Sequence, residues 1–583
     1  MPSNLLPQTD VDPDGLAVAS VGSNASYTWS GLESRARQFA AALAASGLSV
    51  GDRWAVMAHN RIEWTPMVLG NLRAGTRYVP INWHLTVEEV AYLLSDSGSR
   101  LLVVDTVGAE VGRAAASLVG IERVVVIGPR PGEGEFAEWL ADHPDIQPPD
   151  DPAGAVRNYT SGTTGRPKGV QRSDQTGTAK TVLREVTANW GRFYDLPDHG
   201  PHLVVSPMYH ALPSAFHNAA LGLGQSILFD DRFDADRFLT TVQDQSVTSA
   251  LIVPTHIVRM AKRVDELAGR HDLSSLVSVV HGGAPCPRWA KEVVMDWWGP
   301  VVYELFGSSE GTGPLRVTPE AWRERPGTVG KSAPTLTVAA FDEDGGQLPD
   351  GEVGNLYFLR VDGRPEYVGD PDKTEASRLP GGWFTVGDVG WVDADGYVYL
   401  SDRKIDMVIS GGANIYPAEV EAVLIAHPAV ADCAVFGIPD DEWGEEVKAA
   451  VEFCIANYRG PLFLGVHSFG GRMASHAVID HELDVDGMIF CSFPLHPRGK
   501  TSTARAGHLD AIRPPVLFLS GTRDALAEPE LLGQTVRAAG AKLQWLETAD
   551  HGYGVLKRTR RRQDDVFDEM AGYVRDFVVS VTS

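Results

Sequence analysis

The chain has 583 residues and a formal net charge of −25, from 51 basic and 76 acidic side chains. Its length exceeds what one hydrophobic core supports, so we expect two to four compact units, and its charge disfavours nucleic acid or anionic lipid as partners. The four cysteines are scattered and the sequence shows no secretory leader pattern, which predicts a protein of the reducing cytoplasm. The apolar runs are much shorter than the roughly 18 residues of a membrane span, so we expect no such span.

The first half of the sequence alternates helical patterns with short apolar runs. Helices are predicted at 32–46 and 87–95, and strands at 100–105, 123–128, 203–206, 250–254 and 278–281. This alternation is typical of parallel α/β units. From about Thr337, shorter strands separated by Asp-Gly and Gly-Gly turns predict a smaller β-rich subdomain. After Glu452 three further α/β units are expected, with strands at 462–465, 516–520 and 543–547.

Residues 159–169 read YTSGTTGRPKG and carry three glycines, four hydroxyl side chains and Lys168. Glycines allow backbone N–H groups to close around phosphate oxygens, hydroxyls add hydrogen bonds, and the lysine balances triphosphate charge. The spacing differs from that of a Walker A loop. An isolated loop of this kind is equally compatible with a polar turn that binds nothing.

Five more motifs follow this loop in the order PMYH (207–210), GGAP (282–285), YELFGSSE (303–310), GWFTVGD (382–388) and SDRKID (401–406), the last running into GGANIYPAE (411–419). Together they closely resemble the signature of the adenylate-forming superfamily, which contains acyl-CoA synthetases, peptide-synthetase adenylation domains and luciferases. The resemblance covers about residues 20–452. It implies an α/β fold with a large N-terminal domain of several subdomains at 1–401 and a small, truncated α+β lid domain at 402–452.

The resemblance also implies roles for individual residues. The phosphates of ATP would be held by Thr160, Ser161, Gly162, Thr163, Thr164, Gly165 and Lys168, and a Mg²⁺ ion by Glu310. The adenine and the adjoining part of the nucleotide would be bound by Gly283, Ala284, Pro285, Phe306, Gly307, Ser308 and Ser309; Ser309 replaces the usual threonine but keeps its hydroxyl. Asp388 and Arg403 would contact the ribose. Gly411 and Gly412 would face the incoming thiol, and His210 would lie where the substrate carboxylate meets the α-phosphate.

The implied reaction has two steps and uses ATP, Mg²⁺ and coenzyme A. A carboxylate attacks the α-phosphate to give an acyl-adenylate and pyrophosphate, and a thiol then displaces AMP to give a thioester. The lid domain rotates between the steps about a hinge that matches Asp402. The segments expected to line the acyl pocket, 209–218, 255–260 and 280–283, are small and apolar with a few histidines. They favour a fatty or other hydrophobic acid as the small-molecule substrate, and an aryl or branched acid next.

The resemblance to the synthetases stops near Glu452, before the Gly-Lys whose lysine assists adenylation. Residues 464–475 instead read as a strand, a sharp turn at Ser468 and a helix, and Asp524 and His551 each follow a later predicted strand. Ser, Asp and His in this order resemble the second half of a dienelactone-hydrolase-like α/β hydrolase, expected at 453–583. Lys500 also follows a glycine, but it falls within the hydrolase pattern, so we do not assign it the synthetase role.

Three hypotheses follow for the whole chain. The first is an acyl-CoA synthetase with impaired adenylation. The second is a serine hydrolase, although the half-domain lacks the strands and one oxyanion donor that should precede the elbow and carries Val466 where a glycine normally stands, so we expect it to be inert. The third is an inactive fusion product, because both partners are joined inside a domain rather than at a linker. The oligomeric state cannot be inferred.

Overall fold

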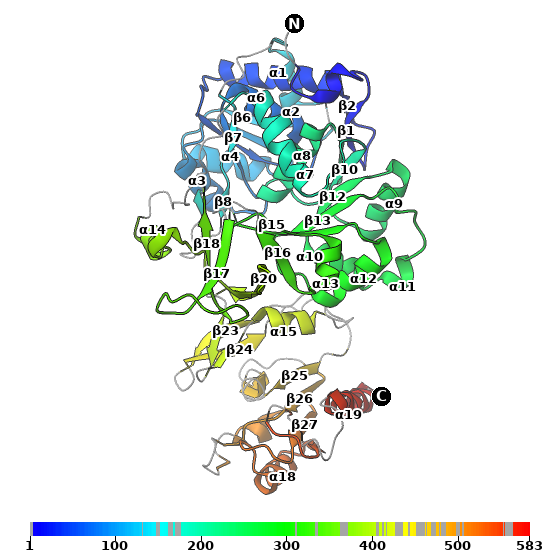
Figure 1. Cartoon of the computed structure of the whole chain (residues 1–583), viewed down its shortest axis with the longest axis vertical. Coiled ribbons are helices and arrows are strands. Elements are labelled where there is room, and N and C mark those ends of the chain that lie inside the picture. Colours follow the sequence, from blue (N-terminus) through cyan, green and yellow to red (C-terminus); the bar gives the residue numbers. More distant parts are fainter. Residues whose placement is uncertain are drawn as a thin grey trace. The chain divides into compact units, whose positions relative to one another are not determined.

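The computed structural model divides into two compact units, Met1–Ser401 and Asp402–Ser583, each described separately below (Figure 1). It describes residues 4–130, 132–146, 152–160, 167–169, 177–308, 312–332, 336–361, 371–403, 407–410, 413–415, 417–425, 435–440, 444–449, 461, 463–467, 474–476, 478–479, 485–496, 502–503, 506–551, 553, 555 and 564–582. Within these residues, no helix is both long enough and apolar enough to cross a membrane.

The first of two large sheets in the first unit has five parallel strands, in the order β6-β5-β3-β4-β7. Its strands are β3 (Arg53–Met57), β4 (Arg77–Pro80), β5 (Leu102–Asp105), β6 (Val124–Ile127) and β7 (Ala155–Val156). Side chains alternate across it: Trp54 and Val56 face one buried cluster, and Ala55 and Met57 face another. The first cluster includes α1 (Trp29–Ala45), α2 (Trp64–Ala74) and α5 (Glu135–Ala141); the second includes α3 (Val87–Ser97) and α4 (Ala109–Leu118).

The second sheet of this unit has thirteen strands in the order β17-β18-β19-β20-β16-β15-β14-β13-β12-β10-β11-β1-β2. Its parallel part contains β1 (Leu16–Ser20), β10 (Pro201–Val204), β11 (Ser226–Phe229), β12 (Ser249–Ile252), β13 (Ser278–Gly282) and β14 (Val302–Phe306), with β2 (Ser26–Thr28) antiparallel at one edge. The helices of this region are α6 (Ala179–Thr181), a π-helical turn (Val182–Thr187), α7 (Ala188–Phe193), α8 (Ala211–Leu223), α9 (Ala235–Gln245), α10 (Pro254–Ala261), α11 (Val264–Leu267) and α12 (Arg288–Trp298).

The antiparallel part of the large sheet begins earlier than the sequence pattern indicated. Its first strand is β15 (Leu315–Val317), which pairs directly with β14, so the β-rich region extends the parallel sheet instead of starting near Thr337. The remaining strands are β16 (Thr328–Ser332), β17 (Leu336–Phe341), β18 (Gly354–Arg360), β19 (Asp388–Val392) and β20 (Tyr397–Arg403), accompanied by α13 (Pro319–Glu324) and α14 (Pro371–Ala376).

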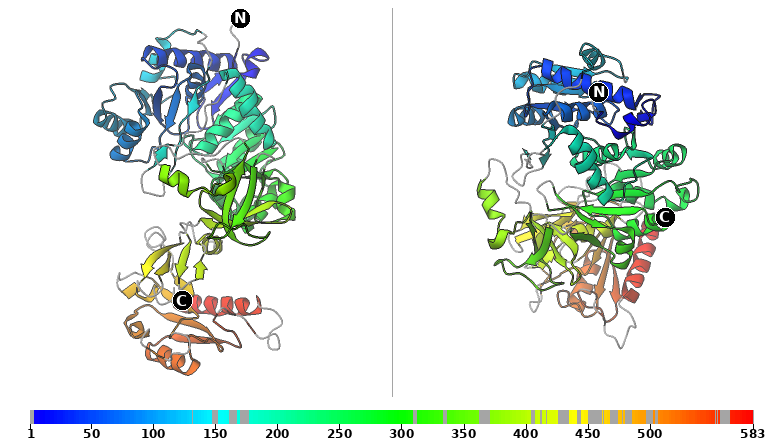
Figure 2. Two further views of the ribbon diagram at one scale, coloured as in Figure 1. Left: turned by 60° about the vertical axis from the view of Figure 1, so that its left-hand side comes forward. Right: turned by 45° about the horizontal axis from the view of Figure 1, so that its top comes forward.

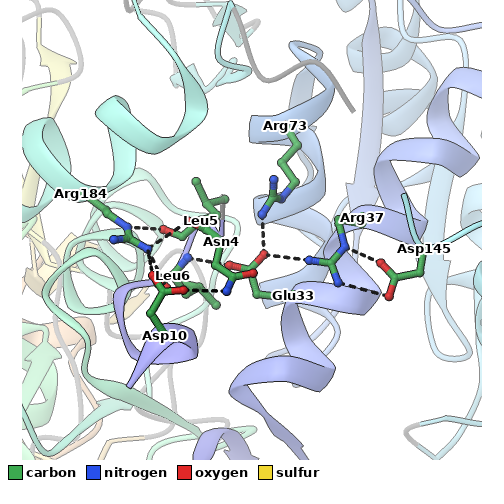
Figure 3. A network of polar contacts seen from close by, with 9 residues as sticks. All are labelled: Asn4, Leu5, Leu6, Asp10, Glu33, Arg37, Arg73, Asp145 and Arg184. Atoms are coloured by element: carbon green, nitrogen blue, oxygen red, sulfur yellow. Dashed lines mark hydrogen bonds and ion pairs between the residues drawn. The ribbon is translucent and has the colours of Figure 1, made fainter. Parts of the chain in front are cut away.

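The first described residues of the chain are held against the fold by a polar network (Figure 3). Arg184, in the π-helical turn, donates to the carbonyl oxygens of Leu5 at 2.8 Å and of Leu6 at 2.8 Å. The carboxylate of Glu33 on α1 is buried, accepts from the backbone N–H of Leu6 at 2.6 Å and pairs with the buried guanidinium of Arg73 on α2. A buried carboxylate requires such partners, because an unpaired charge in the interior is strongly destabilising.

The second unit contains two four-stranded sheets. One is antiparallel, in the order β22-β21-β24-β23, and is formed by β21 (Val408–Ser410), β22 (Ala413–Ile415), β23 (Val435–Asp440) and β24 (Gly444–Ala449). The helix α15 (Pro417–Leu424) lies between β22 and β23 in the chain. The other is parallel, in the order β25-β26-β27-β28, and is formed by β25 (Phe463–His467), β26 (Gly487–Cys491), β27 (Val516–Gly521) and β28 (Lys542–Leu546).

The parallel sheet of the second unit is covered on both faces. Phe490 and Phe518 pack in one buried cluster that includes α18 (Pro529–Ala538), and Ile489 and Leu517 pack in another that includes α19 (Asp564–Thr582). The long α19 runs beside the strands of this sheet in both views of Figure 2. This cover on both faces explains why the two central strands, β26 and β27, are nearly continuous apolar runs, whereas the edge strand β28 is mixed.

Candidate active site

Four neighbouring strands of the large sheet end at the same edge. β10, β12, β13 and β14 are parallel and adjacent, with Val204 opposite Leu251, Ile252 opposite His281, and Gly282 opposite Leu305. The loops that follow these strands contain His210, Gly283 to Pro285, and Gly307 and Ser308, with Phe306 as the last residue of β14. Three of the motif segments singled out in the sequence are therefore brought together at the carboxyl edge of a parallel sheet, where open α/β sheets bind their ligands.

His210 lies at the N-cap of α8 with an extended backbone (φ −84°, ψ 150°), and its side chain makes no capping hydrogen bond. Its N–H donates to the carbonyl of Pro207 at 3.1 Å, which closes the turn before the helix. His210 is exposed, its ring lies 4.4 Å from that of Tyr209, and partial loss of hydration lowers its pKa from the ordinary value. Neutral imidazole is therefore favoured at pH 7.

The Gly283 to Pro285 segment is exposed and leads from β13 into α12. Gly283 has a φ of +91°, a left-handed conformation that glycine adopts without strain. Below the loop, Lys291 on α12 donates to Glu304 on β14 at 2.5 Å, and both groups are buried. This ion pair attaches α12, the helix after the loop, to β14, the strand that ends at Phe306.

Phe306 ends β14, and its half-buried ring lies 6.4 Å from that of Phe358, nearly parallel to it. The backbone N–H of Ser308 donates to Thr312 Oγ1 at 3.0 Å, whereas its own Oγ is buried and has no hydrogen-bond partner among the described residues. A buried hydroxyl in this state requires a partner, which a bound ligand can provide. Asp388 is buried at the start of β19 in the same sheet.

The predicted phosphate loop is bounded by a short antiparallel pair. β8 (Tyr159–Thr160) pairs with β9 (Lys168–Gly169), which places Thr160 opposite Lys168. The base of this loop is fixed from outside, because Tyr159 donates its hydroxyl to Asp96 at 2.5 Å and Tyr92 donates to the carbonyl of Pro167 at 3.0 Å. The apex of the loop, 161–166, lies outside the described residues.

Several other predicted site residues also lie outside the described part of the chain: Ser309, Glu310, Gly411, Gly412 and Ser468; so does Lys500, to which no role was assigned. Of Thr160, Lys168 and Arg403 the structure describes the backbone alone. Asn60, Lys291 and Glu304, which support the loops described above, were not among the predicted site residues. Only Asn60 has a local signal, as a polar residue three positions after the buried strand β3; Lys291 lies within α12 and Glu304 within β14.

In the second unit, Asp524 and His551 meet at the carboxyl edge of the parallel sheet. Asp524 follows β27 and His551 follows β28, and Nδ1 of His551 lies 2.9 Å from each carboxylate oxygen of Asp524. The carboxylate is buried and also accepts from the N–H of Leu526 at 2.8 Å. A buried carboxylate in this position orients the imidazole, as an acid–base pair requires.

Residues 7–361 match the family model described as AMP-binding enzyme, residues 419–456 match the AMP-binding enzyme C-terminal domain, and residues 439–579 match an alpha/beta hydrolase domain. The last two matches overlap, so the change of pattern falls inside the lid region. These matches confirm the resemblance and the fold class that the motifs predicted, including the change to a hydrolase pattern. The predicted domain limits at 401 and 452 stay predictions.

Individual proteins agree with the family models. The chain is 33% identical over 436 residues to the fatty acid–[acyl-carrier-protein] ligase ScoC of Streptomyces coeruleorubidus, covering 73% of this chain and 81% of that one. It is 34% identical over 456 residues to a feruloyl-CoA synthase from an Amycolatopsis species, covering 76% and 86%. The crystal structure of ATP-bound MatB from Rhodopseudomonas palustris is similar with a TM-score of 0.65 and 29% identity, covering 77% of this chain and 88% of that one.

Proposed function

Because the chain belongs to the AMP-binding enzyme family, we propose that it activates a carboxylic acid with ATP and passes the acyl group to a thiol. One observation of the structure supports this above all: the register of β10, β12, β13 and β14 gathers the His210, Gly283 and Phe306 loops at one sheet edge. The Oγ of Ser308, which is buried and has no partner among the described residues, and the exposed wall at Gly283 to Pro285 fit a nucleotide there.

In the proposed mechanism the first step joins the substrate carboxylate to the α-phosphate and releases pyrophosphate. Neutral His210 donates a hydrogen bond to the carboxylate or the α-phosphate, and the N-terminal N–H groups of the thirteen-residue α8 favour negative charge at the same place. Thr160, the hydroxyls and glycines after it, and Lys168 hold the β and γ phosphates, while Asp388 and Arg403 bind the ribose. Glu310 would hold a Mg²⁺ ion, which neutralises phosphate charge when bound.

We propose a hydrophobic acid, a fatty acid first, as the substrate. His217 lies in the expected acyl-pocket segment at 209–218 and His256 in that at 255–260; both are buried, and burial lowers their pKa values to about 4 and about 3. Both rings are therefore neutral, and neither supplies a positive charge for an ionic tail: His217 shares a 2.9 Å hydrogen bond with Thr65, and the ring of His256 stacks on that of Phe233 at 3.9 Å. The named relatives include both a fatty and an aryl acid ligase, so an aryl acid is the next candidate.

We further propose that the adenylation step is slow in this chain. The family's Gly-Lys, whose lysine would contact the carboxylate and α-phosphate, has no counterpart before the sequence changes to the hydrolase pattern near Glu452. Loss of one positioned charge–charge contact in a transition state costs about 10²- to 10³-fold in rate. Binding of ATP depends on other residues and is expected to remain.

A panel of carboxylates, assayed for pyrophosphate and thioester formation with the full chain, tests the proposal. Pyrophosphate release that requires both ATP and a hydrophobic acid supports it, and Lys168→Ala and Glu310→Gln should abolish that release. Lys500→Ala should leave it unchanged. Absence of any nucleotide binding by the wild-type chain, measured calorimetrically with ATP and Mg²⁺, would overturn the assignment.

The contact between His551 and Asp524 supports a second candidate, a serine hydrolase with Ser468 as nucleophile. Against it stands the β25-β26-β27-β28 sheet, in which, among the described residues, no strand precedes β25 on its outer side. A fluorophosphonate probe tests this candidate. Labelling of the wild type that is lost in Ser468→Ala and reduced in Asp524→Asn favours hydrolysis, and a folded wild type that stays unlabelled excludes it.

A further inference from the structure

The turn that carries His210 is held from another sheet by one side chain. Asn60 lies three residues after the end of β3 of the five-stranded sheet, and its Nδ2 donates to the carbonyl oxygens of Ser206 at 3.0 Å and of Asp230 at 3.1 Å. Its Oδ1 accepts from the backbone N–H of Met208 at 2.9 Å. Both amide hydrogens and one oxygen lone pair are therefore used, all on backbone groups far away in sequence.

From this geometry we propose that Asn60 is a positioning residue for carboxylate activation, acting through the turn from Ser206 to His210. The inference rests on the proposed function, because it assigns to Asn60 the placement of the ring that meets the carboxylate.

The turn needs such support for a physical reason. Pro207 lies between Ser206 and Met208, both of which Asn60 binds. Proline has no backbone N–H to donate, so this turn has one main-chain hydrogen-bond donor fewer. Ser206 and Met208 are buried, whereas His210 is exposed. The segment that Asn60 holds is in turn bonded to His210, because the carbonyl of Pro207 accepts from the backbone N–H of His210 at 3.1 Å.

Asn60 also joins two strand ends. Ser206 follows β10 and Asp230 follows β11, and the N–H of Asp230 donates to Val204 at 3.0 Å. One amide thus fixes the spacing between the first sheet and two adjacent strands of the second. A shift of about 1 Å in a group that orients a reactant can reduce the rate about 10²-fold, so loss of this amide is expected to be felt at His210.

A purely structural role must be distinguished from a positioning role, and the chain contains a matched control. Asn71 also makes three hydrogen bonds: its Oδ1 accepts from Trp54 at 2.9 Å and from Thr76 at 2.8 Å, and its Nδ2 donates to the carbonyl of Ala155 at 3.2 Å. It contacts residues of the five-stranded sheet and the turn before β4, and none of these three bonds involves the His210 turn. Asn71→Ala therefore removes the same chemistry at another place.

The experiment compares the full-length wild type, Asn60→Ala, Asn60→Asp and Asn71→Ala. Asn60→Asp keeps the shape and the acceptor for Met208 but loses both donors, so it serves if the alanine variant does not fold. Two quantities are measured: the affinity for a non-reactive acyl-sulfamoyl adenosine, and kcat and KM for pyrophosphate release. Melting temperatures report the structural cost of each change.

We expect Asn60→Ala to bind the analogue at least 10-fold more weakly and to lose about 10- to 100-fold in kcat, with KM for ATP within threefold of wild type. Asn71→Ala should stay within threefold in both quantities although its melting temperature falls. Equal losses in the two alanine variants, or none in either Asn60 variant, would overturn the inference. A wild type that binds neither ATP nor the analogue would instead overturn the proposed function, and the inference with it.

Discussion

The ammonium group of Lys291 donates to Oε2 of Glu304 at 2.5 Å, and the side chain of Lys291 is fully buried. The lysine also lies over the ring of Trp322 at 4.7 Å, and Nε2 of His281 is 3.6 Å from the same oxygen of Glu304. Burial and the charge of Lys291 lower the pKa of His281 far below its ordinary value, so the histidine is neutral. Lys291 is therefore the cation that balances Glu304.

The first prediction follows from this pair. Lys291→Met should destabilise the N-terminal unit by about 3–5 kcal/mol, because it leaves the buried Glu304 carboxylate without its cation. Urea denaturation followed by tryptophan fluorescence measures the change. The double variant Lys291→Met/Glu304→Leu should recover most of the loss, since replacing both charges with apolar groups removes the unpaired one. A single variant as stable as wild type would show that the pair is dispensable.

The second prediction concerns acid stability. Burial lowers the pKa values of His202 to about 3, of His217 to about 4 and of His256 to about 3, against about 6.5 in an unfolded chain. Between these values the unfolded state binds protons that the folded state does not, so stability falls as the pH drops below about 6.5. Each histidine contributes a slope of about 1.4 kcal/mol per pH unit.

This slope can be assigned to one residue. In His202→Gln the dependence of the unfolding free energy on pH between about 4.5 and 6 should decrease by the contribution of one proton. The exposed His199→Gln is the control and should keep the wild-type slope. Parallel curves for wild type and His202→Gln would contradict the prediction, whatever the change in stability at neutral pH.

The third prediction concerns Asp105 at the end of β5. Burial alone would raise its pKa, but hydrogen bonds from the N–H groups of His59 at 2.9 Å and Gly108 at 3.0 Å, and the His59 ring at 2.8 Å, outweigh it and lower the pKa. A lowered carboxyl pKa stabilises the fold above the unfolded value of about 3.9, and this contribution is lost as the pH falls further. The stability difference between wild type and Asp105→Asn should therefore shrink below about pH 4 in acid titrations of the melting temperature.

The fourth prediction separates binding from strain at Gly283. Its φ of +91° makes Gly283→Ala unfavourable by about 1–2 kcal/mol, although among the described residues an added methyl group would meet nothing nearer than Leu212 at 3.9 Å. Gly120, with φ +75° and no described neighbour within 4 Å of an added Cβ, offers a control for positive φ away from the site. Both variants should lose stability, but Gly283→Ala alone should weaken ATP binding in calorimetry. Equal ATP affinities would remove Gly283 from the proposed nucleotide wall.

The strands and helices that hold the site were predictable because their patterns are local. The runs predicted at 250–254 and 278–281 correspond to β12 (Ser249–Ile252) and β13 (Ser278–Gly282), and the helix predicted at 32–46 corresponds to α1 (Trp29–Ala45). Short runs rich in β-branched residues between turn residues favour strands over buried helix segments. Asp524 and His551 were predicted to act together through the resemblance to the hydrolase order of Ser, Asp and His, each at a strand end.

The supporting residues could not be predicted in the same way. Lys291 lies in a helix with charged and aromatic neighbours, where a lysine is ordinarily exposed, and its burial depends on Glu304 in another element. Asn60 binds residues 146 to 170 positions away, and nothing in its local sequence specifies them. The early start of the antiparallel strands at β15 was missed because a three-residue strand gives almost no periodic signal.

The attachment of the N-terminal segment has a consequence for biosynthesis. Arg184 binds the carbonyl of Leu5 across 179 residues of sequence. It lies in the π-helical turn Val182–Thr187, which comes later in the chain than all the strands of the five-stranded sheet. A ribosome that adds about 5–20 residues per second needs roughly 10 to 35 s to reach that arginine after synthesizing the segment. Leu5 and Leu6 are both fully buried in the finished protein. During that interval the residues that bury them are not all synthesized, so their side chains are accessible to chaperones.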